Sequence, residues 1–265
     1  MTNTADHREW DAGAYDTLNA PMNVRGTDAV ARLELRGDET VLDAGCGTGQ
    51  VTATLLERLP RGRVVALDGS TAMLAAARER FGGDPRVSFV HADLGEALVP
   101  AVEARSIDAI VSTSTFHWVR NHDALFCHLA EVLKPGGQLV VDCGGAGNIA
   151  AVLDALHELG YDDEDFPWTY AGVDETRVRL RAAGFEVLDV RLVPRVSHHD
   201  PGELERFLTS VVLRTFVTEL GPEGGAALVR DVAARLPERA LHWVRLEIVA
   251  QLATGGPGLH PRRMD

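Results

Sequence analysis

Three alternating glycines and a preceding carboxylate are the residues best suited to binding a ligand. They lie in the run Asp43-Ala44-Gly45-Cys46-Gly47-Thr48-Gly49, between a short apolar stretch and an amphipathic one. Glycines between a strand and a helix let the backbone turn tightly and let a ligand approach it closely. The first turn of the following helix offers unpaired N–H groups. The pattern therefore predicts a ligand-binding loop.

This loop lacks the pattern of a phosphate-binding loop. A dinucleotide fingerprint, Gly-x-Gly-x-x-Gly, would need its third glycine at position 50 or, in the shifted register, at position 52. Those positions hold Gln50 and Thr52, and there is no Gly-x-x-x-x-Gly-Lys-Ser/Thr run. A nicotinamide oxidoreductase is therefore a disfavoured alternative.

Two further acids follow at the ends of predicted strands. Asp68 ends the second apolar run and Asp93 the third. An acid at the end of the second strand of such a sheet reaches the ribose hydroxyls of a bound nucleoside. Asp93 is placed to accept a hydrogen bond from an exocyclic amine such as that of adenine. Each acid alone could equally be a helix cap or a solvated side chain, but the ordered set with Asp43 favours a cationic nucleoside.

The elements that must position these residues alternate between strands and helices. We expect strands over residues 40–43, 64–68, 87–91, 107–112, 138–143, 185–193 and 241–252, and helices over 50–59, 70–81, 123–133, 148–159, 174–183, 201–220 and 222–236. Ser70 suits the N-cap of the second helix. Residues 134–137 form a sharp turn and residues 162–168 an acidic, aromatic loop. The alternation predicts a parallel sheet with helices on both faces.

Composition narrows the class of partner. The 265 residues have a formal net charge of -13, which disfavours nucleic acid. The three cysteines have no metal-ligand spacing, and His198-His199-Asp200 is expected to be a polar turn, so no metal is predicted. The N-terminus is polar, and no apolar run approaches the ~20 residues of a membrane span. We expect a cytoplasmic protein without membrane contact, as a monomer or homodimer.

These motifs together resemble those of one family. The run Asp43 to Gly49 closely resembles the glycine motif of Rossmann-like (class I) S-adenosylmethionine (SAM)-dependent methyltransferases. Asp68-Gly69-Ser70, Ala92-Asp93-Leu94 and Leu133-Lys134-Pro135-Gly136-Gly137 resemble their ribose motif, their adenine motif and the turn before their fifth strand. Residues 11–15, Phe116-His117-Trp118 and a late helical insertion are most similar to the group that methylates trans-aconitate, malonyl thioesters and juvenile-hormone acid.

The resemblance implies an α/β fold with a Rossmann-like seven-stranded mixed sheet. Its order would be 3-2-1-4-5-7-6, with the last strand antiparallel, helices on both faces and a helical lid. The expected divisions are N-terminal cap helices over 1–39, a SAM-binding domain over 40–255 that includes a substrate lid over 195–240, and a flexible tail over 256–265.

The resemblance also implies a site for SAM, with S-adenosylhomocysteine as product. The glycines would pass the methionine part, Asp43 would position its ammonium, and Asp68 and Asp93 would bind the ribose and the adenine. The expected cofactor residues are Asp43, Ala44, Gly45, Cys46, Gly47, Thr48, Gly49, Asp68, Gly69, Ser70, Met73, Ala92, Asp93, Leu94 and Ser112. Gly69 departs from the family, which often has a larger residue there.

The acceptor is expected beside the fourth strand, where residues 112–118 leave the sheet. His117 is the predicted catalytic residue. It could act as a general base for a hydroxyl or amine, or only orient a carboxylate, which needs no base; an ordinary pocket or capping histidine is an equal alternative. The predicted substrate contacts are Tyr15, Asn19, Phe116 and Trp118, and the candidate carboxylate partners are Arg25, Arg195 and Arg214.

The sequence therefore predicts a SAM-dependent methyltransferase that acts on a small molecule. The expected reaction is O-methylation of a carboxylate or a natural-product intermediate. The alternative is a SAM-binding, non-methylating member of the fold, either of cyclase type or a partner subunit.

Overall fold

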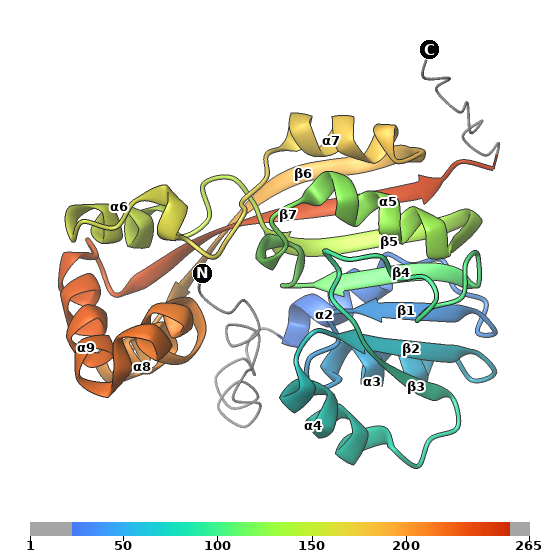
Figure 1. The fold of residues 1–265 in the computed structure, drawn as a ribbon, viewed down its shortest axis with the longest axis horizontal. Coiled ribbons are helices and arrows are strands. Elements are labelled where there is room, and N and C mark those ends of the chain that lie inside the picture. The colour runs from blue at the N-terminus through green and yellow to red at the C-terminus, as the bar shows by residue number, and fades with distance from the viewer. Residues whose placement is uncertain (1–22, 255–265) are drawn as a thin grey trace.

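The centre of the fold is a seven-stranded sheet in the order β3-β2-β1-β4-β5-β7-β6 (Figure 1). The computed structural model describes residues 23–254. The strands are β1 (Thr40–Ala44), β2 (Arg63–Asp68), β3 (Val87–His91), β4 (Ile107–Thr113), β5 (Leu133–Gly144), β6 (Phe185–His198) and β7 (Ala240–Leu252). The first five pair in parallel, and β7 is antiparallel to both of its neighbours. The strand order and fold class that the family resemblance implied are confirmed.

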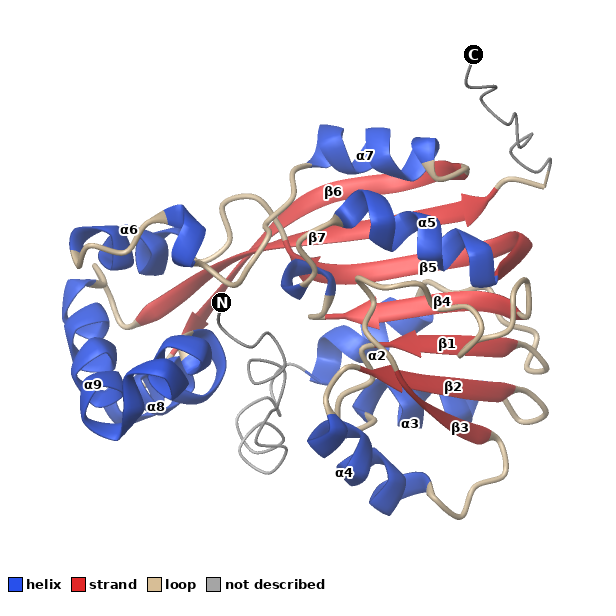
Figure 2. Cartoon of the chain, viewed as in Figure 1, coloured by secondary structure: helices blue, strands red, loops and turns tan. Residues whose placement is uncertain are grey.

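Helices cover both faces of the sheet (Figure 2). The helices of the sheet layer are α2 (Asn23–Ala31), α3 (Gln50–Arg58), α4 (Thr71–Phe81), α5 (His122–Val132) and α7 (Val173–Ala182). Neighbouring residues of a strand point to opposite faces. Val41 accordingly packs in one core with α2 and α3, and Leu42 packs in another with α5 and α7. Burial on both faces explains why these strands are continuous apolar runs.

Local signals placed several boundaries correctly. The Ser70 hydroxyl accepts a hydrogen bond from the Met73 N–H at 3.2 Å, so α4 begins where the predicted cap lies.

The sharp turn predicted at residues 134–137 is not a separate turn in the structure. These residues form a bulge within β5, because the pairing with β4 skips from Leu133 to Gln138. Gly136 adopts a φ of 79° in this bulge.

The late helical region differs from the prediction. Instead of one helix over 201–220, α8 (Pro201–Phe207) is followed by a π-helical turn, η5 (Leu208–Val212), and then by α9 (Arg214–Arg235). The predicted break near 221 is present: Gly221 has a φ of 71° inside α9, and Pro222 cannot donate the helical hydrogen bond. β6 extends to His198, so residues 195–198 belong to the sheet and not to a helical lid.

A second hydrophobic core lies beside the sheet, at the far end of the long β6–β7 ribbon (Figure 1). It combines α6 (Ala150–Glu158), α8, η5 and α9 with Trp243 of β7. The loop at residues 162–168 contains a short turn, η4 (Asp163–Asp165), and buries Phe166 and Trp168 in this core. The lid, defined here as residues 148–170 and 199–239, is therefore larger than the predicted 195–240.

Some predictions lie outside the described residues. These are Tyr15, Asn19, the first part of the predicted cap helices and the tail over 256–265. Within residues 23–254, no helix is both long enough and apolar enough to cross a bilayer.

Candidate active site

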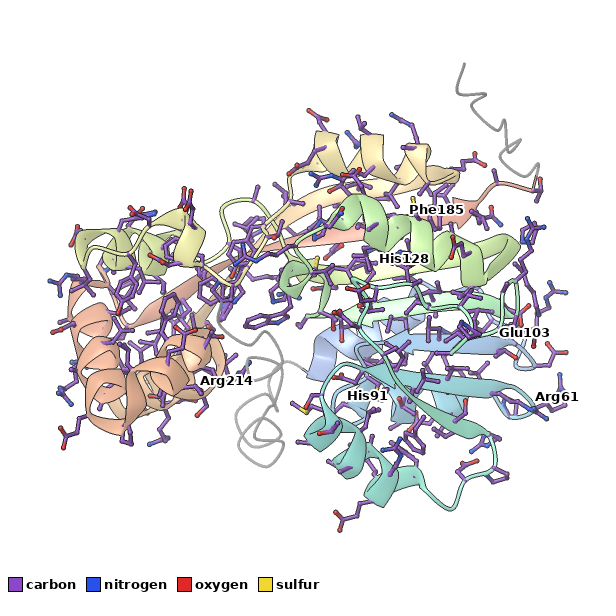
Figure 3. All side chains as sticks on the ribbon, in the orientation of Figure 1. Arg61, His91, Glu103, His128, Phe185 and Arg214 are labelled. Carbon is purple, nitrogen blue, oxygen red and sulfur yellow. The ribbon has the colours of Figure 1, made fainter. Side chains whose placement is uncertain are left out.

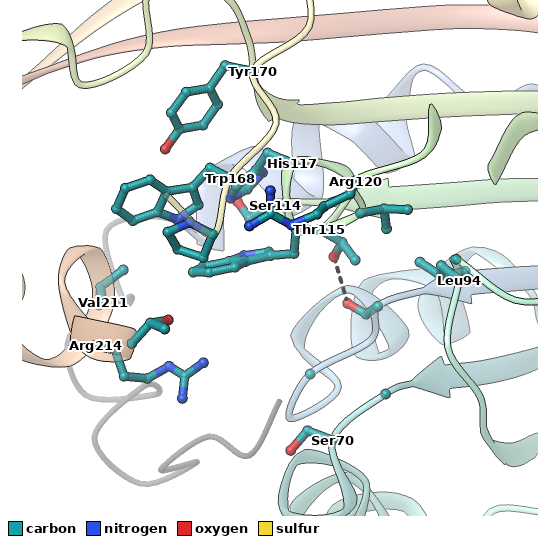
Figure 4. A pocket seen from close by; sticks show the side chains of 18 of the residues that line it. Ser70, Leu94, Ser114, Thr115, His117, Arg120, Trp168, Tyr170, Val211 and Arg214 are labelled. Carbon is teal, nitrogen blue, oxygen red and sulfur yellow. Dashed lines mark hydrogen bonds between the residues drawn. The ribbon is translucent and has the colours of Figure 1, made fainter. Parts of the chain in front are cut away.

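A cavity of about 640 Å³ lies between the carboxyl ends of the parallel strands and the lid (Figure 4). One part is lined by the loops after β1, β2 and β3. The other part is lined by the segment after β4, the residues just before α6, the loop after η4, the start of α9, and β7. The strand order reverses between β1 and β4, which is where α/β sheets bind ligands.

The glycine loop after β1 forms one wall of this cavity. Gly45 has a φ of 83°, and a Cβ atom there would collide with the side chain of Thr115. Thr115, which follows β4, is in turn held by a hydrogen bond from its Oγ1 to the Thr113 carbonyl at 3.0 Å. Glycine at this position lets the loop after β1 pack directly on the segment after β4.

The loop's amide groups are already bonded within the protein. The N–H groups of Gly45 and Cys46 both donate to the Leu67 carbonyl, at 2.8 and 2.9 Å. Gly47 donates to Asp68 Oδ2 at 2.8 Å, and Gly49 donates to the Cys46 carbonyl at 2.9 Å. A phosphate-binding loop instead points such groups at its ligand. This geometry disfavours a pyrophosphate, as the missing third glycine also does.

Asp68 joins the loops after β1 and β2. Its carboxylate accepts hydrogen bonds from the Gly47 and Ser70 N–H groups, each at 2.8 Å. Burial raises the pKa of this carboxyl, and the backbone amides of Ser70, Gly47 and Gly69 oppose that shift. A carboxylate has about four acceptor positions, so Asp68 can hold the loop and still accept hydroxyl groups from a ligand.

Asp43 is buried behind the loop, with 1% of its surface exposed. Its Oδ2 accepts a hydrogen bond from Thr52 Oγ1 at 2.6 Å. Burial raises the pKa of Asp43 to about 7, Thr52 opposes that shift, and the nearby charge of Asp68 adds to it. The residue predicted to contact the ligand's ammonium is thus behind the cavity wall.

This burial predicts a pH-dependent stability. The pKa of Asp43 rises from 3.8 when unfolded to about 7 when folded, so between these values the folded state binds more protons. The free energy of unfolding should therefore fall as pH rises from about 4 to about 7, by up to about 4 kcal/mol. Urea unfolding of the cofactor-free protein, repeated across this pH range, measures the effect. The free energy of unfolding should fall less with rising pH in Asp43→Asn than in the wild type. Equal slopes in the two proteins would contradict the assignment.

Eight of the predicted cofactor residues line the cavity, namely Gly45, Gly47, Asp68, Gly69, Ser70, Met73, Asp93 and Leu94. The other seven, Asp43, Ala44, Cys46, Thr48, Gly49, Ala92 and Ser112, do not. Ser112 is buried, and its hydroxyl donates to the Ala44 carbonyl at 2.6 Å, which ties β4 to β1. Asp93 Oδ1 accepts the Gly95 N–H at 2.9 Å and so shapes the loop after β3.

The short turn η3 (Phe116–Trp118) sends its three side chains in different directions. His117 and Trp118 line the cavity. Phe116 packs in the sheet core, edge-on to Phe126 with ring centroids 6.1 Å apart, so the prediction that it contacts the substrate is not supported by its position.

His117 is a buried, neutral ring. Its Nδ1 accepts a hydrogen bond from the Gly144 N–H at 3.2 Å. Burial, followed by the nearby charges of Arg245 and His122, lowers the pKa of His117 well below 6.5. A neutral imidazole that accepts at Nδ1 must have its proton on Nε2. The ring is therefore a hydrogen-bond donor at Nε2.

Arg245 of β7 is a cavity residue that the sequence analysis missed. It is 3% exposed, its Nε donates to Asp142 Oδ1 at 2.6 Å, and its Nη2 donates to Ser114 Oγ at 3.0 Å. Ser114 has an unusual φ of 55° just after β4. The available signal was an arginine between the apolar residues Val244 and Leu246 of a predicted strand, because an arginine is rarely buried without a partner of opposite charge.

The three arginines predicted as carboxylate partners differ in their position relative to the cavity. Arg214, at the start of α9, lines the cavity and extends from the lid towards the sheet (Figures 3 and 4). Arg195 lies on β6 with a side chain that is 56% exposed, near Glu247 at 3.9 Å, and it does not line the cavity. The side chain of Arg25 is outside the described part of the chain. Arg120, which was not predicted, also lines the cavity and donates to the Phe166 carbonyl at 3.0 Å.

Known proteins match the chain in sequence. Residues 41–137 match the model of a methyltransferase domain family. The trans-aconitate 2-methyltransferases of Acidovorax ebreus and Escherichia coli K12 are 36% and 33% identical over 133 residues, about half of each chain. An uncharacterized methyltransferase of Schizosaccharomyces pombe is 30% identical over 200 residues, 70% of this chain and 74% of its own. The chain thus spans about half the length of its trans-aconitate relatives.

Solved structures match the fold. The [4+2]-cyclase SpnF superposes with a TM-score of 0.61 at 22% identity, over 88% of this chain and 81% of its own. A methyltransferase-like protein from Bacillus halodurans does so with a TM-score of 0.61 at 19% identity, over 87% of this chain and all of its own (100%).

The sheet order and the loop after β1 define a methyltransferase fold. The chain belongs to the Rossmann-like SAM-dependent methyltransferases. SAM is the cofactor that this family uses.

Proposed function

We propose that this methyltransferase transfers the methyl group of SAM to an oxygen of a small-molecule acid, with a carboxylate as the accepting group. The trans-aconitate 2-methyltransferases among its relatives support a small acidic acceptor. The observation that carries the proposal is the hydrogen bond from the Gly144 N–H to Nδ1 of the buried His117 ring, at 3.2 Å. Because its Nδ1 accepts the Gly144 N–H, the neutral ring donates at Nε2 and does not remove a proton. A carboxylate is already deprotonated at neutral pH and needs only orientation.

The cavity residues suit SAM on the side of the glycine loop. Asp68 is proposed to accept the ribose hydroxyls, Asp93 the adenine amine, and Gly45 and Gly47 to let the methionine arm pass. None of the eight lining cofactor residues is basic, which suits a cation without phosphate. When bound, SAM supplies an activated methyl group on a sulfonium.

Asp43 is proposed to act on the ligand's ammonium through its negative charge, from behind the loop. Its contact with Thr52 of α3 also positions the start of that helix relative to β1.

The lid is proposed to cover the acceptor. Arg214 approaches from α9, while His117 approaches from the sheet, so an acid between them would meet donors on two sides. Guanidinium groups bind carboxylates through two parallel hydrogen bonds. Closing the site against water leaves positioning and desolvation to accelerate an in-line displacement.

A labelled-methyl assay tests the proposal. The protein is incubated with SAM labelled in its methyl group and with small carboxylic acids, and base-labile label is expected in the extracted products, as methyl esters give. A cyclase-type or partner-subunit member of the fold would bind SAM and transfer no label.

His117 gives a second test. If it orients the acceptor as a neutral donor, kcat/KM for the acceptor at saturating SAM should be flat between about pH 6.5 and about pH 8.5, because His117 does not titrate there. His117→Phe should lower kcat/KM by about 10- to 100-fold, the value of one hydrogen bond to a charged group. His157→Phe, at an exposed position of α6 outside the cavity, is the matched control. A limb with a pKa near 6.5 that disappears in His117→Phe would instead make His117 a general base.

A further inference from the structure

The acceptor side of the cavity has a continuous aromatic surface. Trp118 comes from η3, and Trp168 and Tyr170 come from the segment before α7; we call these three side chains the aromatic wall. The ring centroids of Trp118 and Trp168 are 6.0 Å apart, and those of Trp168 and Tyr170 are also 6.0 Å apart with planes only 10° from parallel. The His117 ring lies 5.5 Å from Trp118 and 5.9 Å from Tyr170. The group expected to orient the carboxylate therefore borders this wall (Figure 4).

The wall is fixed by the surrounding structure. Trp168 packs against Phe166 and Phe216 of the second hydrophobic core, with centroids 6.2 Å away in each case. Tyr170 is hydrogen bonded to the Asn148 side chain, whose Oδ1 also accepts the Val244 N–H at 2.9 Å. A surface held in place in this way loses little freedom when a ligand binds.

Aliphatic side chains accompany the aromatic wall. Ile149, at the start of α6, and Val211 and Val212, in η5, line the same cavity and belong to the same hydrophobic core as the wall. Ile149 has a φ of 48°, which is unusual for a β-branched residue and places it at the cavity. An acceptor made only of polar groups would leave this apolar surface against water. Planar apolar groups, in contrast, pack well on aromatic rings.

The charges on the acceptor side of the cavity are of both signs. Arg120, Arg214 and Arg245 line it together with Asp165 and Glu219, and Arg245 is paired with Asp142. Aromatic surfaces also bind cations through their π faces. The acceptor is taken as an anion because the proposed function gives it a carboxylate and because the SAM beside it would carry a positive charge.

We infer that the acceptor is a carboxylic acid with a flat, apolar body, of the aryl or alkenyl class, and that this body packs on the aromatic wall while its carboxylate meets His117. The inference rests on the proposed function for the position of the carboxylate. It goes beyond it because small polyacids such as trans-aconitate have no such body.

The test compares ligands that share one head group. trans-Cinnamate and crotonate both have a propenoate head, but cinnamate has a phenyl group where crotonate has a methyl. Calorimetric titration of the full chain saturated with S-adenosylhomocysteine should show cinnamate binding at least about tenfold more tightly than crotonate, and more tightly than trans-aconitate.

Trp168→Leu should remove most of the advantage of cinnamate over crotonate. The matched control is Phe207→Leu, which removes an aromatic ring from the same core at a position that does not line the cavity and whose ring neighbours are His199 and Trp243, and it should keep the advantage. Binding of S-adenosylhomocysteine, measured alone, checks that both variants are folded.

The outcomes separate the inference from the proposed function. Equal affinities for the three acids, tighter binding of trans-aconitate, or no binding of any of them would overturn the aromatic wall as the acceptor's subsite. If trans-aconitate accepts label while cinnamate does not bind, the aromatic wall is not the acceptor's subsite, and the proposed function as a carboxylate methyltransferase is supported. If cinnamate binds through Trp168 but neither it nor any other carboxylic acid tested accepts label, the aromatic wall is supported and the proposed function is wrong.

Discussion

Replacing Asp68 with alanine is expected to weaken SAM binding at least about 100-fold. The proposed ribose contacts are hydrogen bonds to a charged group, each contributing about 1.5–3 kcal/mol. The same carboxylate also holds the Gly47 and Ser70 amides at 2.8 Å, so its removal releases the loops after β1 and β2 together. The loss should therefore exceed that from the ribose contacts alone.

Calorimetric titration with SAM measures this effect. Asp154→Ala, at an exposed aspartate of α6 outside the cavity, is the matched control and should bind as the wild type does. Asp68→Asn should fall between the two, because the amide keeps one acceptor oxygen but loses the charge. Wild-type affinity in Asp68→Ala would place the adenosyl group elsewhere.

Replacing Arg245 with methionine is expected to lower the free energy of unfolding by about 3–5 kcal/mol, the typical cost of leaving one member of a buried ion pair alone. The pair is well enclosed, since the side chains of Arg245 and Asp142 are 4% and 13% exposed. The variant would leave the Asp142 carboxylate without its main cation. It would also release Ser114 at the end of β4.

A double variant separates charge from packing. Arg245→Met combined with Asp142→Leu should recover much of the lost stability in urea unfolding, because no unpaired charge remains. Arg191→Met, which removes an arginine that is 56% exposed and paired with Glu247, should cost about 1 kcal/mol or less. If the double variant is no more stable than Arg245→Met, packing and not the unpaired carboxylate explains the loss.

Much of the cofactor half could be predicted because its signals are local. The run from Asp43 to Gly49 predicts a tight turn from its own residues, because glycine can adopt the positive φ that lets the loop pack on Thr115. Asp68 ends β2 and Asp93 follows β3, and the apolar residues of both strands identify them in the sequence. Parallel strands bring their carboxyl ends to one edge of the sheet. Such local signals do not show how deeply a side chain is buried. Asp43 and Asp68 both follow apolar residues of a strand in the sequence, but only Asp68 lines the cavity.

The acceptor half depended on contacts between distant residues. Arg245 and Asp142 are 103 positions apart, and their pairing exists only because β7 inserts between β5 and β6. Phe166 and Trp168 were predicted to lie in an acidic, aromatic loop, and the structure buries both against Phe216 of α9.

The sequence by itself determined the strand–helix alternation, the glycine loop, the capping of α4 and the acids at the strand ends, because each depends on neighbouring residues and their backbone preferences. Only the tertiary structure decided which of these side chains reach the cavity, that His117 donates at Nε2, and that an aromatic wall faces it. The physical reason is that burial and hydrogen-bond partners come from whichever segments the fold brings together, and these lie far apart along the chain.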